Sequence, residues 1–81
     1  MVRLTKSADK SLKRLPRDIS EKVRGAIRAL AVAPTSGKKL TGNLEGRWTY
    51  RVGRSYRIIY ELVGGGDLVV RSIGHRRDVY R

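Results

Sequence analysis

Residues 47–63 read RWTYRVGRSYRIIYELV, and their apolar residues change from an alternating pattern to an almost continuous one. The alternation over residues 47–52 is the period of a half-buried β-strand. The apolar run over residues 56–63 predicts a second strand, in the centre of a sheet. A glycine-rich turn at residues 64–67 and a further apolar stretch at residues 68–73 complete the pattern. The sequence therefore predicts an antiparallel meander of three strands.

The N-terminal part of the chain carries a short strand followed by two helical patterns. Residues 2–5 alternate like a strand, and Ser7 is placed to cap a first helix. Pro16 ends that helix, because the residue before a proline avoids the α conformation, and suits the first position of a second helix. Pro34 ends the second helix, and residues 34–46 have the composition of a loop. Apolar residues of the second helix recur on one face: Ile19, Val23, Ala26, Ile27 and Leu30.

These elements predict an α+β fold of order β-α-α-β-β-β. We expect the N-terminal strand and the helical hairpin to pack on one face of a small, mainly antiparallel sheet. A chain of 81 residues has one thin hydrophobic core, so residues 1–81 are expected to form a single domain. That size excludes a two-domain enzyme or a doubly wound nucleotide fold, and it leaves the second face of the sheet uncovered.

The composition points to an anionic partner. Lys and Arg number 19 against 7 Asp and Glu, which gives a formal charge of +12. The positive electrostatic field of such a charge attracts RNA, DNA or an acidic protein. The chain has no Cys and one His, so a disulfide framework, a thiolate metal site and a His-only metal site are excluded. No apolar run reaches the ~18 residues of a membrane span, and charged residues interrupt the N-terminal segment where a signal peptide would be apolar, so we expect a cytoplasmic protein.

Strand alternation places basic residues on the uncovered face. If Trp48 and its alternate neighbours face the helices, Arg51 must face away from them. The same argument on the next strand places Arg57 beside Arg51. His75 and Arg76 follow the third strand and are expected in the same region. Clustered arginines of this kind suit a phosphodiester.

Some assignments stay open at this point. The alternation of the third strand does not settle which face carries Arg71. Arg51 and Arg57 have an alternative interpretation, as cross-strand ion pairs with Glu61 or Asp67. The glycines at 64–66 do not form a phosphate loop, because no helix and no Lys-Ser/Thr follow them.

The motifs WTYRVGRSYRIIY at residues 48–60 and IGHRRDVY at residues 73–80 resemble the hairpin and C-terminal motifs of the RelE/ParE toxin superfamily. LKRLP at residues 12–16 is similar to the end of the family's first helix, and KLTG at residues 39–42 precedes the hairpin as it does in the family. Each motif is short, but their order and spacing cover essentially the whole chain.

The resemblance implies a toxin of a type II toxin–antitoxin system that an acidic or acidic-tailed antitoxin neutralises. RelE-like members enter the ribosomal A site and cleave mRNA by attack of a 2′-hydroxyl on the adjacent phosphate, without metal or cofactor. ParE-like members instead inhibit DNA gyrase and need no nuclease site. We expect the first activity, with gyrase inhibition or a non-catalytic nucleic-acid-binding module as the alternatives.

The resemblance also assigns roles to residues that match the family motifs. Arg51 matches the position proposed as base or phosphate contact, and Arg57 matches the arginine that stabilises phosphate charge. Arg76 matches the terminal arginine to which the family assigns charge stabilisation or protonation of the leaving group. Tyr80 matches the C-terminal tyrosine that stacks on a base or orients the substrate. His75 lies at a position that is often His or another basic residue in the family. Further RNA contacts are expected from Arg47, Arg54, Arg77 and Arg81.

The chain departs from the well-studied RelE nucleases at two positions of the hairpin. Thr49 stands where those enzymes have a basic residue, and Arg51 stands where they have lysine. Because arginine stays protonated, Arg51 is a poor general base.

Overall fold

The computed structural model describes residues 1–77 and confirms the α+β fold class. Its helices and strands follow the expected order, with one additional strand and three short 3₁₀ turns. The elements are β1 (Val2–Leu4), α1 (Lys6–Arg14), α2 (Arg17–Val32), η1 (Pro34–Ser36), β2 (Lys38–Lys39), η2 (Gly42–Leu44), β3 (Trp48–Val52), β4 (Tyr56–Val63), η3 (Gly64–Gly66) and β5 (Asp67–His75).

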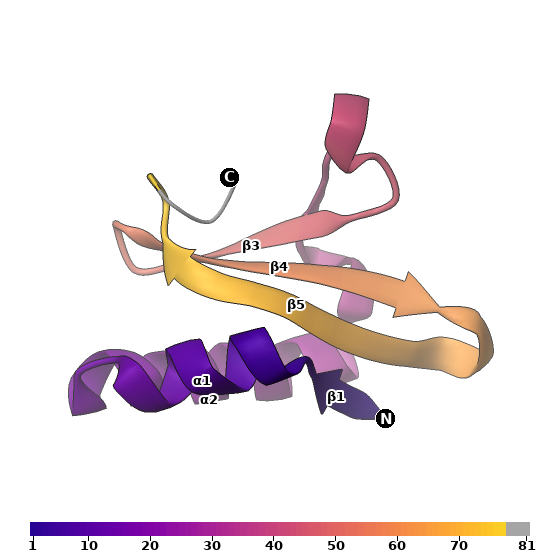
Figure 1. Cartoon of the computed structure of the whole chain (residues 1–81). Helices are drawn as coiled ribbons and strands as arrows, with labels where there is room; N and C mark the ends of the chain where they lie inside the picture. Colours follow the sequence, from indigo (N-terminus) through magenta and orange to yellow (C-terminus); the bar gives the residue numbers. More distant parts are fainter. Residues whose placement is uncertain (78–81) are drawn as a thin grey trace.

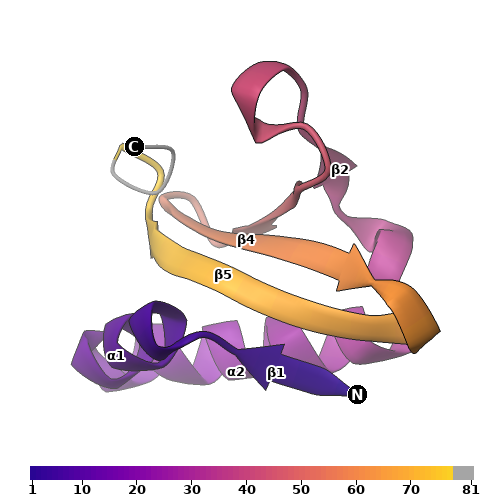
Figure 2. The ribbon, with the colours of Figure 1, turned by 45° about the vertical axis from the view of Figure 1, so that its right-hand side comes forward.

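One sheet and one layer of helices make up this fold. The strand order is β1-β5-β4-β3-β2, with β1 parallel to β5 and the other neighbours antiparallel. Both α1 and α2 lie on the same side of the sheet (Figure 1). The segment that carries η2 rises on the opposite side, at one end of the sheet (Figure 2). No helix within residues 1–77 is long and apolar enough to cross a membrane.

The structure corrects three local expectations. Thr5, not Ser7, caps α1: its Oγ1 accepts a hydrogen bond from the Ala8 N–H at 3.1 Å, and its backbone is still extended at the end of β1. Pro16 is the residue before α2 and not its first residue. Residues 34–46 are not all loop, because Lys38–Lys39 pairs with β3. A strand of two residues is too short for alternation to reveal it.

The core lies between the helices and one face of the sheet. Each large apolar side chain buried there stabilises the fold by about 1.5–3 kcal/mol relative to an exposed one. On β4, Ile58 and Tyr60 are fully buried against the helices, and Ile59 is only 2% exposed on the other face. The buried cluster consists of Ala8, Leu12, Val23, Leu30, Val52, Ile58, Tyr60, Leu68, Val70 and Ile73.

A β-bulge resolves the ambiguity of the last strand. Ile59 pairs with Ser72 and Tyr60 pairs with Val70, so Arg71 is an extra residue on β5. A bulge of this kind resets the alternation. Val70 and Ile73 can therefore both face the helices, which strict alternation forbids.

The hydroxyl of Tyr60 holds the segment after α2 against the sheet. It donates a hydrogen bond to the Pro34 carbonyl at 2.8 Å and accepts one from the Gly37 N–H at 3.1 Å. Burial raises the pKa of Tyr60 above its usual value, against the lowering effect of the Gly37 hydrogen bond, and the nearby Tyr50 adds to the rise. The segment 34–37 is thereby fixed beside β3, directly before β2 pairs with that strand.

The raised pKa of Tyr60 predicts that stability falls at alkaline pH. An unfolded tyrosine ionises near pH ~10, whereas folded Tyr60 keeps its proton, so the unfolded state binds fewer protons as the pH rises through ~10. We expect Tyr60→Phe to cost about 1–3 kcal/mol at neutral pH, because the part-buried Pro34 carbonyl and Gly37 N–H each lose a hydrogen bond. The variant should then lose less further stability than the parent between about pH 9 and pH 11. Urea unfolding of both proteins measures this, and equal alkaline losses would contradict it.

Candidate functional site

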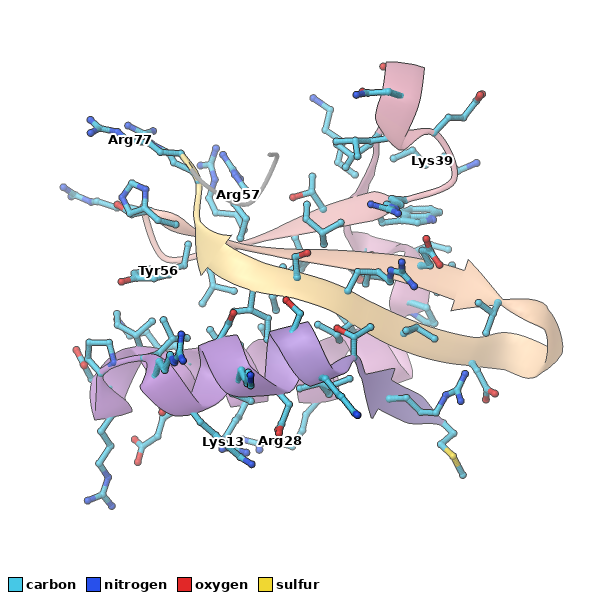
Figure 3. All side chains as sticks on the ribbon, in the orientation of Figure 1. Lys13, Arg28, Lys39, Tyr56, Arg57 and Arg77 are labelled. Carbon is cyan, nitrogen blue, oxygen red and sulfur yellow. The ribbon has the colours of Figure 1, made fainter. Side chains whose placement is uncertain are left out.

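Two arginines lie directly opposite each other on the open face of the sheet. Arg51 of β3 and Arg57 of β4 are register partners, as alternation predicted. Figure 3 shows Arg57 projecting from the side of the sheet that faces away from α1 and α2. Like charges directly across a sheet destabilise it. An arrangement that costs stability in this way is suited to bind an anion.

The Arg57 side chain is partly enclosed in a hollow of about 380 Å³. Its Nε is buried and has no hydrogen-bond partner within residues 1–77. Buried N–H donors are nearly always paired in folded proteins, so an unpaired one calls for an explanation. The guanidinium carries four further N–H donors, which suit a phosphate bound in the hollow. The hollow is lined by Ser36, Gly37, Lys38, Thr49, Tyr50, Arg51 and Arg57.

The nearby carboxylates bind other cations. Glu61 Oε1 lies 3.1 Å from Arg47 Nε and 3.9 Å from Arg71 Nε. Asp67 pairs with the N-terminal amino group at 3.3 Å. Within the described part of the chain, neither Arg51 nor Arg57 forms an ion pair. The structure therefore does not support the alternative interpretation, in which these two arginines form cross-strand ion pairs with Glu61 or Asp67.

His75 and Arg76 lie at the end of β5, next to the facing pair Arg51 and Arg57. Gly74 is the register partner of Arg57, and His75 is the partner of Tyr56, whose ring it meets edge-on at 5.9 Å. The Nδ1 of His75 accepts a hydrogen bond from the Arg77 N–H at 3.2 Å, which places the proton of a neutral ring on Nε2. The Arg76 N–H donates to the Ser55 carbonyl at 2.6 Å and ties this end of the chain to the β3–β4 turn.

The remaining predicted RNA contacts are dispersed. Arg47 is engaged with Glu61, Arg54 is exposed in the β3–β4 turn, and Arg77 is exposed beyond β5 (Figure 3). Tyr80 and Arg81 lie outside the described residues. The sequence argument missed Lys38, which lines the hollow from β2, because nothing in the loop composition marks a strand there.

A second concave surface lies on the helical side of the molecule. A groove of about 480 Å³ runs between β1, α1 and α2. Its apolar residues are Leu4, Leu12 and Ile27, and its charged residues are mostly basic. The charged lining consists of Lys6, Asp9, Arg24 and Arg28.

The fold and the site define a small basic α+β domain with an arginine-lined open sheet. Within residues 1–77, no group of three or more acidic, His or Cys side chains is placed to hold a metal ion. The model of the family described as "ParE toxin of type II toxin-antitoxin system, parDE" matches residues 2–80. The chain belongs to this family of toxins, and the resemblance to the RelE/ParE superfamily is confirmed. No curated protein sequence matches the chain.

Solved structures of related toxins share the fold. The RelBE2 toxin–antitoxin complex of Mycobacterium tuberculosis contains a chain 30% identical to this one, with a TM-score of 0.85; the match covers 94% of this chain and 96% of that one. The YoeB/ParE toxin from Agrobacterium tumefaciens is 24% identical with a TM-score of 0.81, over 93% and 96% of the two chains. The intact Escherichia coli RelBE complex, at 16% identity, 93% and 94% coverage and a TM-score of 0.78, is similar in fold.

Proposed function

We propose that this toxin is a metal-independent, ribosome-dependent mRNA endoribonuclease that inhibits translation. One observation carries the proposal: the facing pair Arg51 and Arg57, with the buried Arg57 Nε unpaired in a hollow of the open face. A gyrase inhibitor that acts by binding alone does not require such a pair. A cleaved phosphodiester, which gains negative charge in the transition state, does.

The proposed reaction is an intramolecular transfer at phosphorus. The 2′-oxygen forms a bond to the adjacent phosphorus, and the bond from phosphorus to the 5′-oxygen of the next nucleotide breaks. One proton leaves the 2′-hydroxyl and one is gained by the 5′-oxygen. Arg51 and Arg57 remain protonated throughout, so their role is to align the phosphate and stabilise its charge.

His75 is our candidate for one of the two proton transfers. Histidine is the residue type that exchanges protons near neutral pH, and His75 lies one residue from the partner of Arg57. We expect His75→Gln to slow cleavage by about 10²-fold or more and to flatten its pH profile. Single-turnover cleavage measured across neutral pH checks this. A variant that cleaves at the parent rate at every pH would remove His75 from the mechanism.

The chemistry is tested on ribosomes that hold a defined mRNA in the A site. The purified toxin is expected to cut within the A-site codon and leave a 2′,3′-cyclic phosphate. An mRNA with a 2′-O-methyl group at the cleaved nucleotide should resist, because the nucleophile is blocked. Cleavage of that methylated mRNA at the normal rate would contradict the proposed attack.

Gyrase inhibition is the second candidate function. It is favoured by the family model that matches the chain, which is that of the ParE toxin. The discriminating assay is supercoiling of relaxed plasmid by purified gyrase. Inhibition by the toxin that persists in an Arg57→Ala variant would support this alternative.

We also propose that a cognate acidic antitoxin binds this toxin. The net charge of +12 favours an acidic partner, and the matched structures include toxin–antitoxin complexes from M. tuberculosis and E. coli. The groove between α1 and α2 offers apolar and basic contacts to an amphipathic acidic segment of that antitoxin. Co-expression with the adjacent short reading frames should restore growth, and a toxin that none of them neutralises would contradict this proposal.

A further inference from the structure

A second basic cluster lies on the open face, away from Arg51 and Arg57. Arg47 of the segment before β3 and Arg71 of β5 both approach the same oxygen of Glu61 on β4 through Nε. Their side chains are 35% and 41% exposed, and that of Glu61 is 28% exposed. Two guanidinium groups carry ten N–H donors and two positive charges, so one carboxylate neither satisfies nor neutralises them. The cluster keeps a net positive charge at the surface.

The β-bulge fixes the backbone from which Arg71 projects. Thr5 binds both carbonyls there: its N–H donates to Val70 O at 3.0 Å, and its Oγ1 donates to Arg71 O at 3.0 Å. The same Oγ1 accepts the N–H of Ala8 in the first turn of α1. Bulges commonly redirect a side chain next to a functional site. Arg71 thus projects from a braced backbone, and its Nε lies 3.9 Å from Glu61 Oε1, an ion pair without a hydrogen bond.

The two basic clusters are aligned along the strands. Glu61 lies four residues beyond Arg57 on β4 and on the same face. Because a strand rises about 3.3 Å per residue, the clusters are separated by roughly 13 Å along the strand. Thr49, Ile59 and Ser72 lie in register between them. A single nucleic-acid strand that follows β4 would bring one phosphate to each cluster.

We propose that Arg47 and Arg71, oriented by Glu61, form a second phosphate subsite for single-stranded RNA. This inference rests on the proposed RNA substrate and extends it to the neighbouring nucleotides. The subsite binds the backbone and not a base, so it adds affinity without sequence preference. Arg71 and Glu61 become binding and positioning residues that the motifs of the sequence did not mark.

The test compares two uncleavable 2′-O-methyl RNAs by fluorescence anisotropy. A dinucleotide has one internucleotide phosphate and can occupy only one subsite, whereas a hexanucleotide can reach both. We expect Arg71→Gln to weaken hexanucleotide binding about five- to tenfold at low salt and to lower its salt slope by about 0.7. Dinucleotide binding should stay unchanged. Arg47→Gln should have the same effect, which guards against a local folding defect in either variant.

Two further variants make the result interpretable. Arg14→Gln removes the same charge from an exposed position at the end of α1, which lines neither the hollow nor the groove, and should leave the affinity for both RNAs unchanged. Arg57→Gln should weaken the binding of both RNAs. The subsite is overturned if the parent protein does not distinguish the two lengths, or if Arg71→Gln and Arg47→Gln bind both RNAs like the parent. Because neither RNA can be cleaved, a failed cleavage assay on ribosomes would refute the nuclease without changing this result.

Discussion

Arg57→Ala is expected to lower the rate of mRNA cleavage by about 10²–10³-fold, the usual cost of removing one preorganised donor to developing charge. The burial of Arg57 Nε at the hollow restricts the side chain before substrate binds, and no ion pair within residues 1–77 engages it. The measurement is single-turnover cleavage on programmed ribosomes.

The stability of the Arg57→Ala fold should not decrease. Arg57 faces Arg51 directly, and removal of one of two like charges relieves repulsion of about 0.2–1 kcal/mol. We therefore expect unfolding at the same or slightly higher urea concentration, together with the loss of cleavage. Arg14→Ala, at an exposed arginine that lines neither the hollow nor the groove, is the matched control and should cleave normally. An Arg57→Ala protein that cleaves within threefold of the parent, or one that loses activity only because it unfolds, would contradict the assigned role.

Gly37→Ala is expected to destabilise the fold by about 1–3 kcal/mol or more. A Cβ at this position would lie 2.6 Å from the Thr49 carbonyl oxygen and would collide with the Tyr60 hydroxyl. The backbone of Gly37, with φ −76°, is one that any residue adopts, so the requirement is for space and not for conformation. For a domain of this size the loss corresponds to roughly 4–8 °C in Tm per kcal/mol.

The same substitution at Gly25 is expected to stabilise the fold instead of destabilising it. It lies inside α2, and a Cβ there would meet only Arg28 Nη2, at 3.8 Å. Alanine is favoured over glycine within a helix by about 0.5–1 kcal/mol, so Gly25→Ala should raise Tm. Thermal unfolding of the two variants gives the comparison. A Gly37→Ala protein as stable as Gly25→Ala would show that residues 34–37 are not packed against Tyr60 and Thr49 as described.

Periodicity predicted the elements that span several turns or pleats. The apolar face of α2 and the alternation of β3 gave both the helical layer and the placement of Arg51 and Arg57 opposite it. Those predictions follow from side-chain spacing alone, and no tertiary information is needed for them.

The features that periodicity missed depend on contacts distant in sequence. Thr5 caps α1 and also binds the bulge at Arg71, 66 residues away in the sequence. From the local sequence alone, Ser7 is an equally suitable N-cap residue. Lys38 enters the site only because β2 pairs with β3. The bulge itself has no signature in the alternation of β5, so the face of Arg71 could not be assigned from sequence.

The most direct test of the proposed activity is induced expression in bacteria with pulse labelling of protein and DNA synthesis and mapping of mRNA 5′ ends. The nuclease proposal predicts that protein synthesis stops first and that new 5′ ends arise inside translated codons. Arg57→Ala and Arg76→Ala, expressed at the same level, should produce neither effect. Arrest of DNA synthesis before translation, with intact mRNA, would contradict the proposal and identify gyrase as the target.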